Sequence, residues 1–224
     1  VVVQQDWESY VWQANSFDPY ARPASVTRSN SQGRSRTDVT SYYNNTDSWV
    51  LGLIASQTNS DTGLVEVHNV YDGSARLAEQ RSFGRSIHRL SYYADGNLAS
   101  ITDGKGNVTT LEQWMRGVPR RIRNADGTTT TAEVDDNGWI TAFSDENGYV
   151  TRYGYDAMGR LTRHDYPTDD TVAWAAITQL FDWVPFAESG IPAGHWRQTT
   201  VTGNARKITY FDALLRPLLL QEFD

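Results

Sequence analysis

A repeat of 21 residues constrains this chain more than any other feature of its sequence. Glycines recur at that spacing in two series, and the second series begins ten residues after the first. The first series is Gly96, Gly117, Gly138 and Gly159, and the second is Gly106, Gly127 and Gly148. Self-similarity at a fixed period indicates that one supersecondary unit packs against copies of itself.

The content of one repeat can be read from its turn residues. Asn137-Gly138 supplies the positive φ angles that tight hairpin turns demand. Residues 139–144 then alternate in character as a strand does, residues 145–148 form the next turn, and residues 149–155 return as a second strand. Each repeat is therefore predicted to be one antiparallel hairpin of two strands.

The composition agrees with an all-β fold. The chain holds 8 Trp, 12 Tyr and 7 Phe beside 17 Gly. Aromatic residues favour strands, and glycine favours tight turns. Because one isolated hairpin is marginal in water, the hairpins must associate side by side. We predict tandem antiparallel β-hairpins that form an extended, twisted β-meander sheet.

The regularity of the repeat divides the chain into four predicted parts. Residues 1–70 are expected to contain diverged repeats and a loop, and residues 71–166 the regular array. Residues 167–209 break the period and are expected to be an irregular insertion packed on the sheet, with a short helix over 174–180. Residues 210–224 are expected to be a further repeat.

Charge and composition argue against several classes of partner. The chain has 20 basic and 27 acidic residues and a net charge of −7, whereas a nucleic-acid partner or an anionic membrane surface requires a basic surface. No apolar stretch approaches the roughly 20 residues that span a bilayer. The absence of cysteine excludes disulfides and thiolate metal sites.

No sequence motif for catalysis, a cofactor or a metal stands out. The four histidines form no HExxH or other i, i+4 pair, and GxSxG, P-loop and GxGxxG motifs are absent. The turns rich in Asp and Asn are too short for an EF-hand calcium loop and are expected to be structural. Paired carboxylates for glycoside hydrolysis are assembled in space, so sequence spacing leaves them open. We predict no cofactor, no metal and no enzymatic activity.

Two groups of side chains are candidates for binding carbohydrate. Trp174, Trp183 and Trp196 lie outside the regular repeat, and exposed tryptophans hold sugars by stacking on an apolar ring face. Arg121 and Arg123 share one face of a predicted strand, where their guanidinium groups suit a sugar acid or a sulfate. The alternative for the arginines is a solvated face paired with acids of adjacent hairpins, and for the tryptophans it is burial.

The segment Tyr155-Asp156-Ala157-Met158-Gly159-Arg160-Leu161 resembles the signature of the RHS/YD-repeat family, in which Tyr-Asp and Gly-Arg-Leu recur at about this spacing. A second, weaker match begins at Tyr71. The positions that define the repeat in this chain are Tyr71, Asp72, Gly96, Gly117, Gly138, Tyr155, Asp156, Gly159, Arg160 and Leu161.

The resemblance implies a specific architecture. Members of the RHS family build long β-sheets that coil into a hollow shell, and in bacterial polymorphic toxins the shell encloses a C-terminal toxin domain. YD repeats have also been associated with carbohydrate binding, and some members are wall-associated. This chain departs from the pattern because it is too short to close a shell and lacks the self-cleavage motif that ends many RHS cores.

Three functions therefore compete. The first is a structural segment of an RHS-like shell in a secreted or surface bacterial protein, with neighbouring repeats or a toxin or cargo domain of the same polypeptide as partners. The second is a carbohydrate-binding or adhesive module, and the third is a polysaccharide-active enzyme. The abrupt start of the sequence leads us to expect a fragment of a longer polypeptide.

Overall fold

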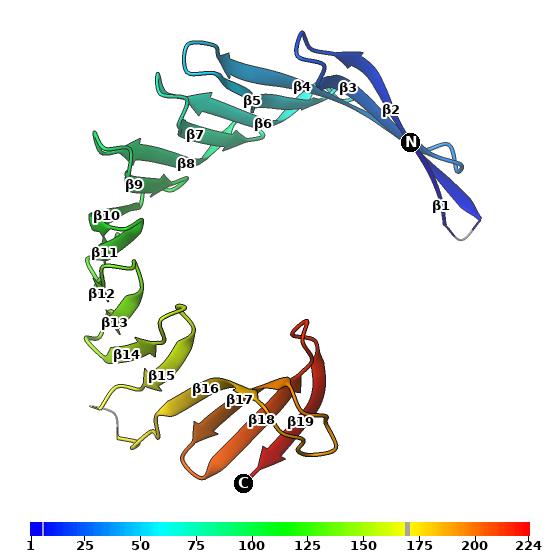
Figure 1. Cartoon of the computed structure of the whole chain (residues 1–224). Coiled ribbons are helices and arrows are strands. Elements are labelled where there is room, and N and C mark those ends of the chain that lie inside the picture. Colours follow the sequence, from blue (N-terminus) through cyan, green and yellow to red (C-terminus); the bar gives the residue numbers. More distant parts are fainter. Residues whose placement is uncertain (6, 169–170) are drawn as a thin grey trace. The chain divides into compact units, whose positions relative to one another are not determined.

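The computed structural model describes residues 1–5, 7–168 and 171–224. Over these residues the chain forms 19 strands and no helix (Figure 1). The strands pair antiparallel with their neighbours in the sequence, as successive hairpins do. The predicted fold class, an all-β meander of tandem antiparallel hairpins, is confirmed. The described residues contain no helix long and apolar enough to cross a membrane.

Contacts divide the chain into two compact units, residues 1–110 and 111–224. Unit 1 pairs its strands in sequence order, from β1 with β2 to β9 with the start of β10. Its strands are β1 (Val2–Gln5), β2 (Glu8–Phe17), β3 (Pro23–Asn30), β4 (Ser35–Asn45), β5 (Val50–Asn59), β6 (Leu64–Tyr71), β7 (Leu77–Ser82), β8 (Arg85–Tyr92), β9 (Leu98–Asp103) and the first residues of β10 (Val108–Met115). The four-part division of the sequence stays a prediction.

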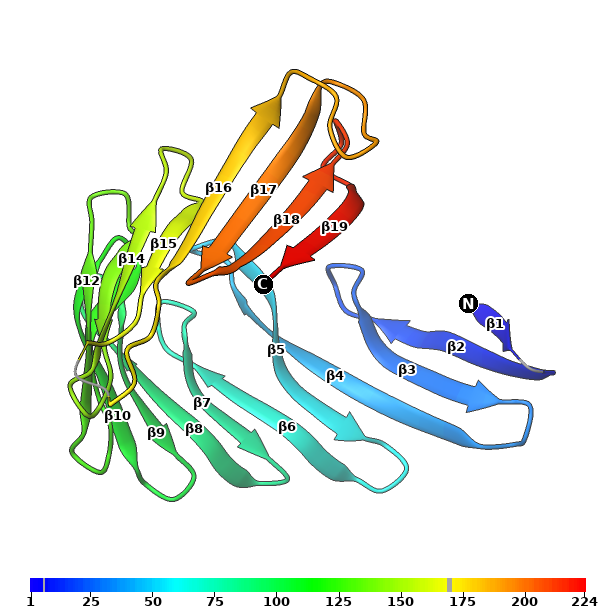
Figure 2. The same cartoon turned by 90° about the horizontal axis from the view of Figure 1, so that it is seen from below.

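Unit 2 holds the rest of β10 and nine further strands, which pair in sequence order from β11 to β19. They are β11 (Val118–Arg123), β12 (Thr129–Val134), β13 (Ile140–Ser144), β14 (Val150–Tyr155), β15 (Leu161–Asp165), β16 (Ile177–Val184), β17 (His195–Thr202), β18 (Ala205–Phe211) and β19 (Pro217–Phe223). Figure 2 shows β16 to β19 side by side in this order.

Many of the hairpins are closed by a five-residue turn of one design. The main-chain N–H of the first turn residue donates to the carbonyl of the fifth, and the N–H of the fourth donates back to the carbonyl of the first. In the turn at residues 135–139, these bonds join Asp135 to Trp139 and Gly138 to Asp135, each at 3.0 Å. The fourth residue takes a positive φ, 88° at Gly138 and 80° at Gly159, as the turn residues predict.

Residues 174–180 do not form the expected helix. Residues from Ile177 onward form β16, and all eight of its residues are in register with β17. Strands β17 and β18 pair in the same way, so this part of the segment expected to pack on the sheet lies within it. Whether a segment forms a strand depends on its cross-strand neighbours. Pairing of all eight residues of β16 with β17 therefore outweighs the local helical preference of its sequence.

The most deeply buried side chains lie under the loop of residues 185–194. Val184 and Tyr210 are 1% and 2% exposed, and Ile191 of the loop packs with Ile208, Tyr210 and the partly buried Leu219. The loop therefore covers one face of β16 to β19. Elsewhere, many large apolar side chains remain partly exposed, as expected of a sheet whose faces have few covering elements.

Candidate functional site

The Tyr-Asp and Gly-Arg residues of the repeat form a turn held by one carboxylate. Asp156 Oδ1 accepts main-chain hydrogen bonds from Met158 at 2.9 Å and Arg160 at 3.0 Å, and Oδ2 accepts from Arg160 Nε at 2.6 Å. The main-chain bond from Arg160 is the main cause that holds the pKa of the Asp156 carboxyl below its usual value. The same carboxylate–arginine turn recurs at Asp18–Arg22, Asp72–Arg76 and Asp212–Arg216.

The glycine of the motif is required by a close approach between repeats. A Cβ atom at Gly159 would lie 2.8 Å from Cζ2 of Trp139, which belongs to the turn at residues 135–139, one repeat earlier. At Gly138 a Cβ would lie 3.0 Å from the Cβ of Arg116. The glycine columns therefore serve both the positive φ angle and the packing of one repeat on the next.

The tyrosine of the motif joins the end of one strand to the start of the strand before it. Tyr92 donates from its hydroxyl to the carbonyl oxygen of Leu77 at 2.8 Å, and Tyr155 donates to that of Ile140 at 2.9 Å. Leu77 and Ile140 are the first residues of β7 and β13. Burial raises the pKa of the Tyr92 and Tyr155 hydroxyls.

The same tyrosine rings contact the fifth residue of the turn that leads into that preceding strand. The guanidinium of Arg76 lies 4.6 Å from the centre of the Tyr92 ring, and the ring centres of Trp139 and Tyr155 are 5.4 Å apart. In both cases the tyrosine ring packs on the fifth turn residue, and the tyrosine hydroxyl donates to the carbonyl of the residue that follows it. We call this pair of contacts the repeat clasp. Arg160 makes only the ring contact, on Phe181 at 4.7 Å.

The three candidate tryptophans do not form one site. Trp183 and Trp196 lie directly opposite each other on β16 and β17, and the Trp196 ring stacks on Phe181 with centres 5.2 Å apart. Trp183 is 53% exposed. Trp174 lies before β16 and contacts Tyr166, with ring centres 5.8 Å apart. A carbohydrate contact at any of the three stays a prediction.

The two candidate arginines share one acidic partner. Arg123 Nε lies 3.3 Å from Glu112, and Arg121 Nε lies 3.9 Å from it. Glu112 belongs to β10 and the arginines to β11, so this arrangement matches the alternative of a face paired with acids of an adjacent strand. An anion site at these arginines stays a prediction.

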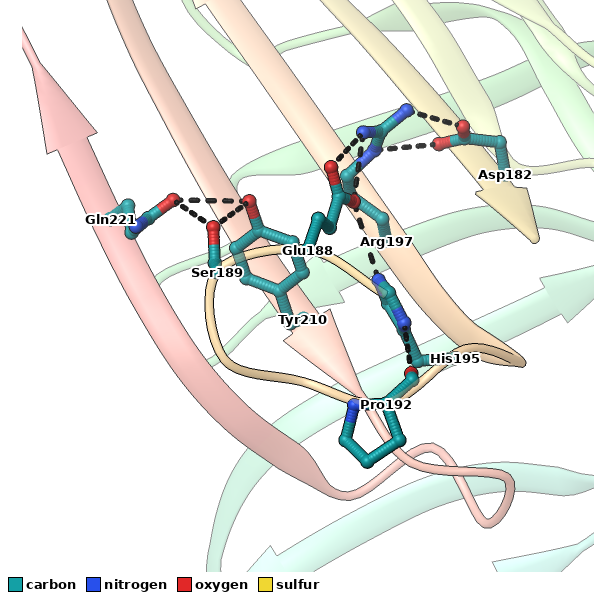
Figure 3. A network of polar contacts seen from close by, with 8 residues as sticks. All are labelled: Asp182, Glu188, Ser189, Pro192, His195, Arg197, Tyr210 and Gln221. Carbon is teal, nitrogen blue, oxygen red and sulfur yellow. Dashed lines mark hydrogen bonds and ion pairs between the residues drawn. The ribbon is translucent and has the colours of Figure 1, made fainter. Parts of the chain in front are cut away.

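A polar network that the sequence does not reveal lies under the loop of residues 185–194 (Figure 3). His195 is 3% exposed, with Nδ1 2.8 Å from the carbonyl of Pro192 and Nε2 3.3 Å from Glu188. Arg197 forms ion pairs with two carboxylates, from Nη1 to Glu188 at 2.9 Å and from Nη2 to Asp182 at 2.7 Å. The hydrogen bond from Arg197 to Asp182 is the main cause that raises the pKa of the guanidinium.

The second half of the network fixes the far side of the loop. Ser189 Oγ and the Tyr210 hydroxyl lie 3.1 Å apart, and Tyr210 donates to Gln221 at 3.0 Å (Figure 3). Side chains from the loop and from β16 to β19 thus satisfy one another. Both ring nitrogens of His195 face protein oxygens, those of Pro192 and Glu188. His195 therefore supports the loop and has no ring nitrogen available to a substrate.

Comparison with known proteins agrees with these local features. The model of the RHS repeat matches residues 134–171. The crystal structure of TcdB2-TccC3-Cdc42 is 14% identical, with a TM-score of 0.53, over 94% of this chain and 12% of that chain. A structure of the Photorhabdus luminescens Tc holotoxin pore with a mutation in TccC3 is 15% identical, also with a TM-score of 0.53, over 95% of this chain and 11% of that chain.

These matches show a shared fold, and this chain spans only a small part of each solved chain. No curated protein matches the sequence. The Tyr-Asp and Gly-Arg-Leu motif, its recurring turn geometry and the match over residues 134–171 support a likeness to the RHS/YD-repeat family.

Proposed function

We propose that this chain is a structural segment of an RHS-type shell, which helps to enclose a toxin or cargo domain of a secreted or surface-attached bacterial protein. The observation that carries the proposal is the packing of one repeat on the next, added to the repeat clasp within each hairpin. In the clasp, Tyr92 and Tyr155 each bind both a side chain and the main chain at the start of the preceding strand. Gly159, in the turn that opens the next repeat, lies close against Trp139 of the turn one repeat earlier. Such packing makes each hairpin depend on its neighbours, which is the requirement for an extended wall.

The last strand of unit 2 supports the same proposal. Strand β19 pairs with β18, and within the described residues of unit 2 no strand pairs with its other side. Leu218 and Leu220 of this strand are 53% and 50% exposed. Unpaired strand edges with apolar side chains are templates for further strands, so β19 is suited to continue a larger sheet.

The arrangement of polar groups favours a scaffold over an enzyme. His195, which lies in the polar network with Glu188 and Arg197, is buried beneath the loop and bonded to Pro192 and Glu188. Among the described residues, no group of three or more His, Cys, Asp or Glu is placed to hold a metal ion. A polysaccharide-active enzyme therefore remains the third candidate. An enzyme of this kind should produce new reducing ends when it is incubated with a polysaccharide.

A carbohydrate-binding module is the second candidate, and one observation favours it. Trp183 presents an exposed ring beside Trp196 on a sheet face, which is a suitable platform for a neutral sugar. If this candidate is correct, a neutral oligosaccharide should raise the melting temperature saturably, and Trp183→Ala should abolish the effect.

The scaffold proposal is tested by sedimentation velocity over a range of protein concentrations. We expect the chain to self-associate through β19, and the double variant Leu218→Lys/Leu220→Lys to stay monomeric. Val39→Lys is the matched control, because Val39 is 40% exposed but pairs with a strand on both sides, at Ser25 and at Thr58. A monomeric wild type at about 100 μM, or equal effects of control and edge variants, would contradict the proposal.

A further inference from the structure

His195 is a buried side chain whose two ring nitrogens both face hydrogen-bond acceptors (Figure 3). Nδ1 lies 2.8 Å from the main-chain carbonyl oxygen of Pro192, and Nε2 lies 3.3 Å from Oε1 of Glu188. A carbonyl oxygen and an ionised carboxylate only accept hydrogen bonds, so each ring nitrogen has to donate. A neutral imidazole carries one N–H, whereas an imidazolium carries two. The geometry therefore requires a second proton on the ring.

The charges of the network require the same second proton. Arg197 donates from Nη1 to both carboxylate oxygens of Glu188, at 2.9 and 3.1 Å, and from Nη2 to Asp182 at 2.7 Å. One guanidinium thus serves two carboxylates, which leaves one negative charge in excess unless His195 is charged. The proton belongs on the imidazole, because an imidazole is a stronger base than a carboxylate and because both oxygens of Glu188 accept from Arg197.

The other neighbours of His195 are uncharged. On β18, the Tyr210 ring centre lies 5.6 Å from that of His195, and the Tyr210 hydroxyl donates to Gln221 of β19 and so carries its proton. The loop of residues 185–194 and the strands β16 to β19 lie wholly within the described residues 171–224. The charges that act on the ring in this part of the structure are those of Asp182, Glu188 and Arg197.

The connection that precedes β16 lies at the far end of that strand. A Cβ atom at Gly203 would lie 3.5 Å from the Cβ of Ala175, so the connection passes beside the turn between β17 and β18. His195 is paired with Val184, the last residue of β16, whereas Ile177 is the first. The seven residue steps between the two ends of the strand span about 23 Å. The network under the loop is therefore remote from this connection.

We propose that the loop of residues 185–194 is a latch on β16 to β19 that is held closed by a proton on His195. With both nitrogens protonated, His195 bonds the loop at Pro192 and Glu188 and balances the network. When the Nε2 proton leaves to solvent, a lone pair faces the Glu188 carboxylate and a negative charge is left buried without a partner. The proton therefore stabilises the closed loop at lower pH, and this stabilisation is lost as the pH rises.

Opening of the latch has a structural consequence. Ile191 of the loop packs on Ile208, Tyr210 and Leu219, so release of the loop uncovers an apolar patch on β18 and β19. The latch thus couples solvent pH to the exposure of this patch. It goes beyond the role of the chain in a shell, and either proposal can fail without the other.

Two measurements on the full chain test the latch. The first is long-range ¹H–¹⁵N NMR of the histidine rings at pH 7.5, with the His195 signals assigned from His195→Gln. The second is hydrogen exchange of the Ile191 and Gly194 amides at pH 6 and pH 9, expressed as protection factors that correct for the intrinsic effect of pH. These amides donate to the carbonyls of Glu188 and Val184, so they report loop closure.

Two variants separate the latch from other effects of pH. Glu188→Gln removes the excess negative charge, so that the neutral ring with its proton on Nδ1 suffices. His88→Gln is the control, because His88 is an exposed histidine on β8, in the other unit of the chain.

We expect both ring nitrogens of His195 to carry protons at pH 7.5 in the wild type, and only Nδ1 in Glu188→Gln. The protection of the two loop amides should fall at least tenfold from pH 6 to pH 9 in the wild type and in His88→Gln. In Glu188→Gln it should change less than threefold. An unprotonated Nε2 in the wild type at pH 7.5, protection that is equal at the two pH values, or the full pH effect in Glu188→Gln would overturn the proposal. The ring measurement on the wild type decides alone if the loop of Glu188→Gln is open at both pH values.

Discussion

The hydroxyl of Tyr155 donates a 2.9 Å hydrogen bond to the carbonyl oxygen of Ile140, while its ring packs on the side chain of the residue before it, Trp139. One side chain thus holds two consecutive residues at the start of the preceding strand. Tyr92 holds Arg76 and Leu77 in the same way, so the contact recurs with a different partner ring or guanidinium. The tyrosine of the motif therefore joins the two strands of one hairpin, and the aspartate and glycine shape the turn.

Removing the Tyr155 hydroxyl should destabilise the fold measurably. Tyr155→Phe keeps the ring contact with Trp139 but leaves the Ile140 carbonyl without its side-chain donor, so we expect a loss of about 1–2 kcal/mol in the free energy of unfolding. Urea denaturation followed by tryptophan fluorescence measures the loss. Tyr149→Phe is the control, because Tyr149 is 41% exposed at the turn of the same repeat. Equal stabilities of the two variants would show that the hydroxyl bond contributes nothing.

Two glycines with the same backbone conformation should respond differently to alanine. Gly148 and Gly159 both have positive φ, 86° and 80°, so alanine strains either position by about 1 kcal/mol. A Cβ at Gly148 meets open space, whereas one at Gly159 meets the Trp139 ring. Gly159→Ala should therefore cost at least about 1 kcal/mol more than Gly148→Ala in thermal or urea unfolding. Equal costs would mean that repeat packing does not restrict this position.

Acid should weaken unit 1 through Glu79. Hydrogen bonds from Arg81, assisted by Arg89, lower the pKa of Glu79 from 4.5 to about 2. Because the folded-state pKa lies below the ordinary value, the ionised Glu79 stabilises the fold above about pH 4.5, and this contribution is lost as the pH falls toward 2.

The variant Glu79→Gln isolates that contribution. We expect wild type to melt at a higher temperature than Glu79→Gln at pH 6, and the difference to shrink steadily between pH 4.5 and pH 2. Glu133→Gln serves as the control, because the side chain of Glu133 makes no ion pair among the residues that the structure describes. A difference that stays constant down to pH 2 would exclude the ion pairing as its cause.

The repeat was predictable because its signals are local. The turn needs a positive φ at Gly138 or Gly159 and a carboxylate at Asp156, and these requirements act over five residues. They therefore appear in the sequence as columns with a period of 21. The partner of each motif tyrosine was not predictable. The tyrosine binds a main-chain carbonyl on the preceding strand, and every residue type has such a carbonyl, so the sequence does not mark it.

The region after residue 166 was harder to predict for two physical reasons. Strand β16 is fixed by its register with β17 across the loop of residues 185–194, and the local run at 174–180 carries no trace of that pairing. The polar network arises because Asp182 and Arg197 are opposed in the same register and Glu188 folds back over them. Spacing in the sequence gives no signal of either relationship.

Deletion of one whole repeat tests the central claim, that clasped 21-residue hairpins build the sheet, most directly. Removing residues 138–158 joins Asn137 to Gly159, which restores a five-residue turn from Asp135 to Arg160 and keeps the pairing order. Removing only residues 138–147 deletes β13, so that β14 has to take its place beside β12 and every later strand runs in the opposite direction relative to the strands before the deletion. We expect the 21-residue deletion to unfold cooperatively within about 10 °C of wild type, and the ten-residue deletion to lose its cooperative transition. Comparable melting of the two variants would contradict the account.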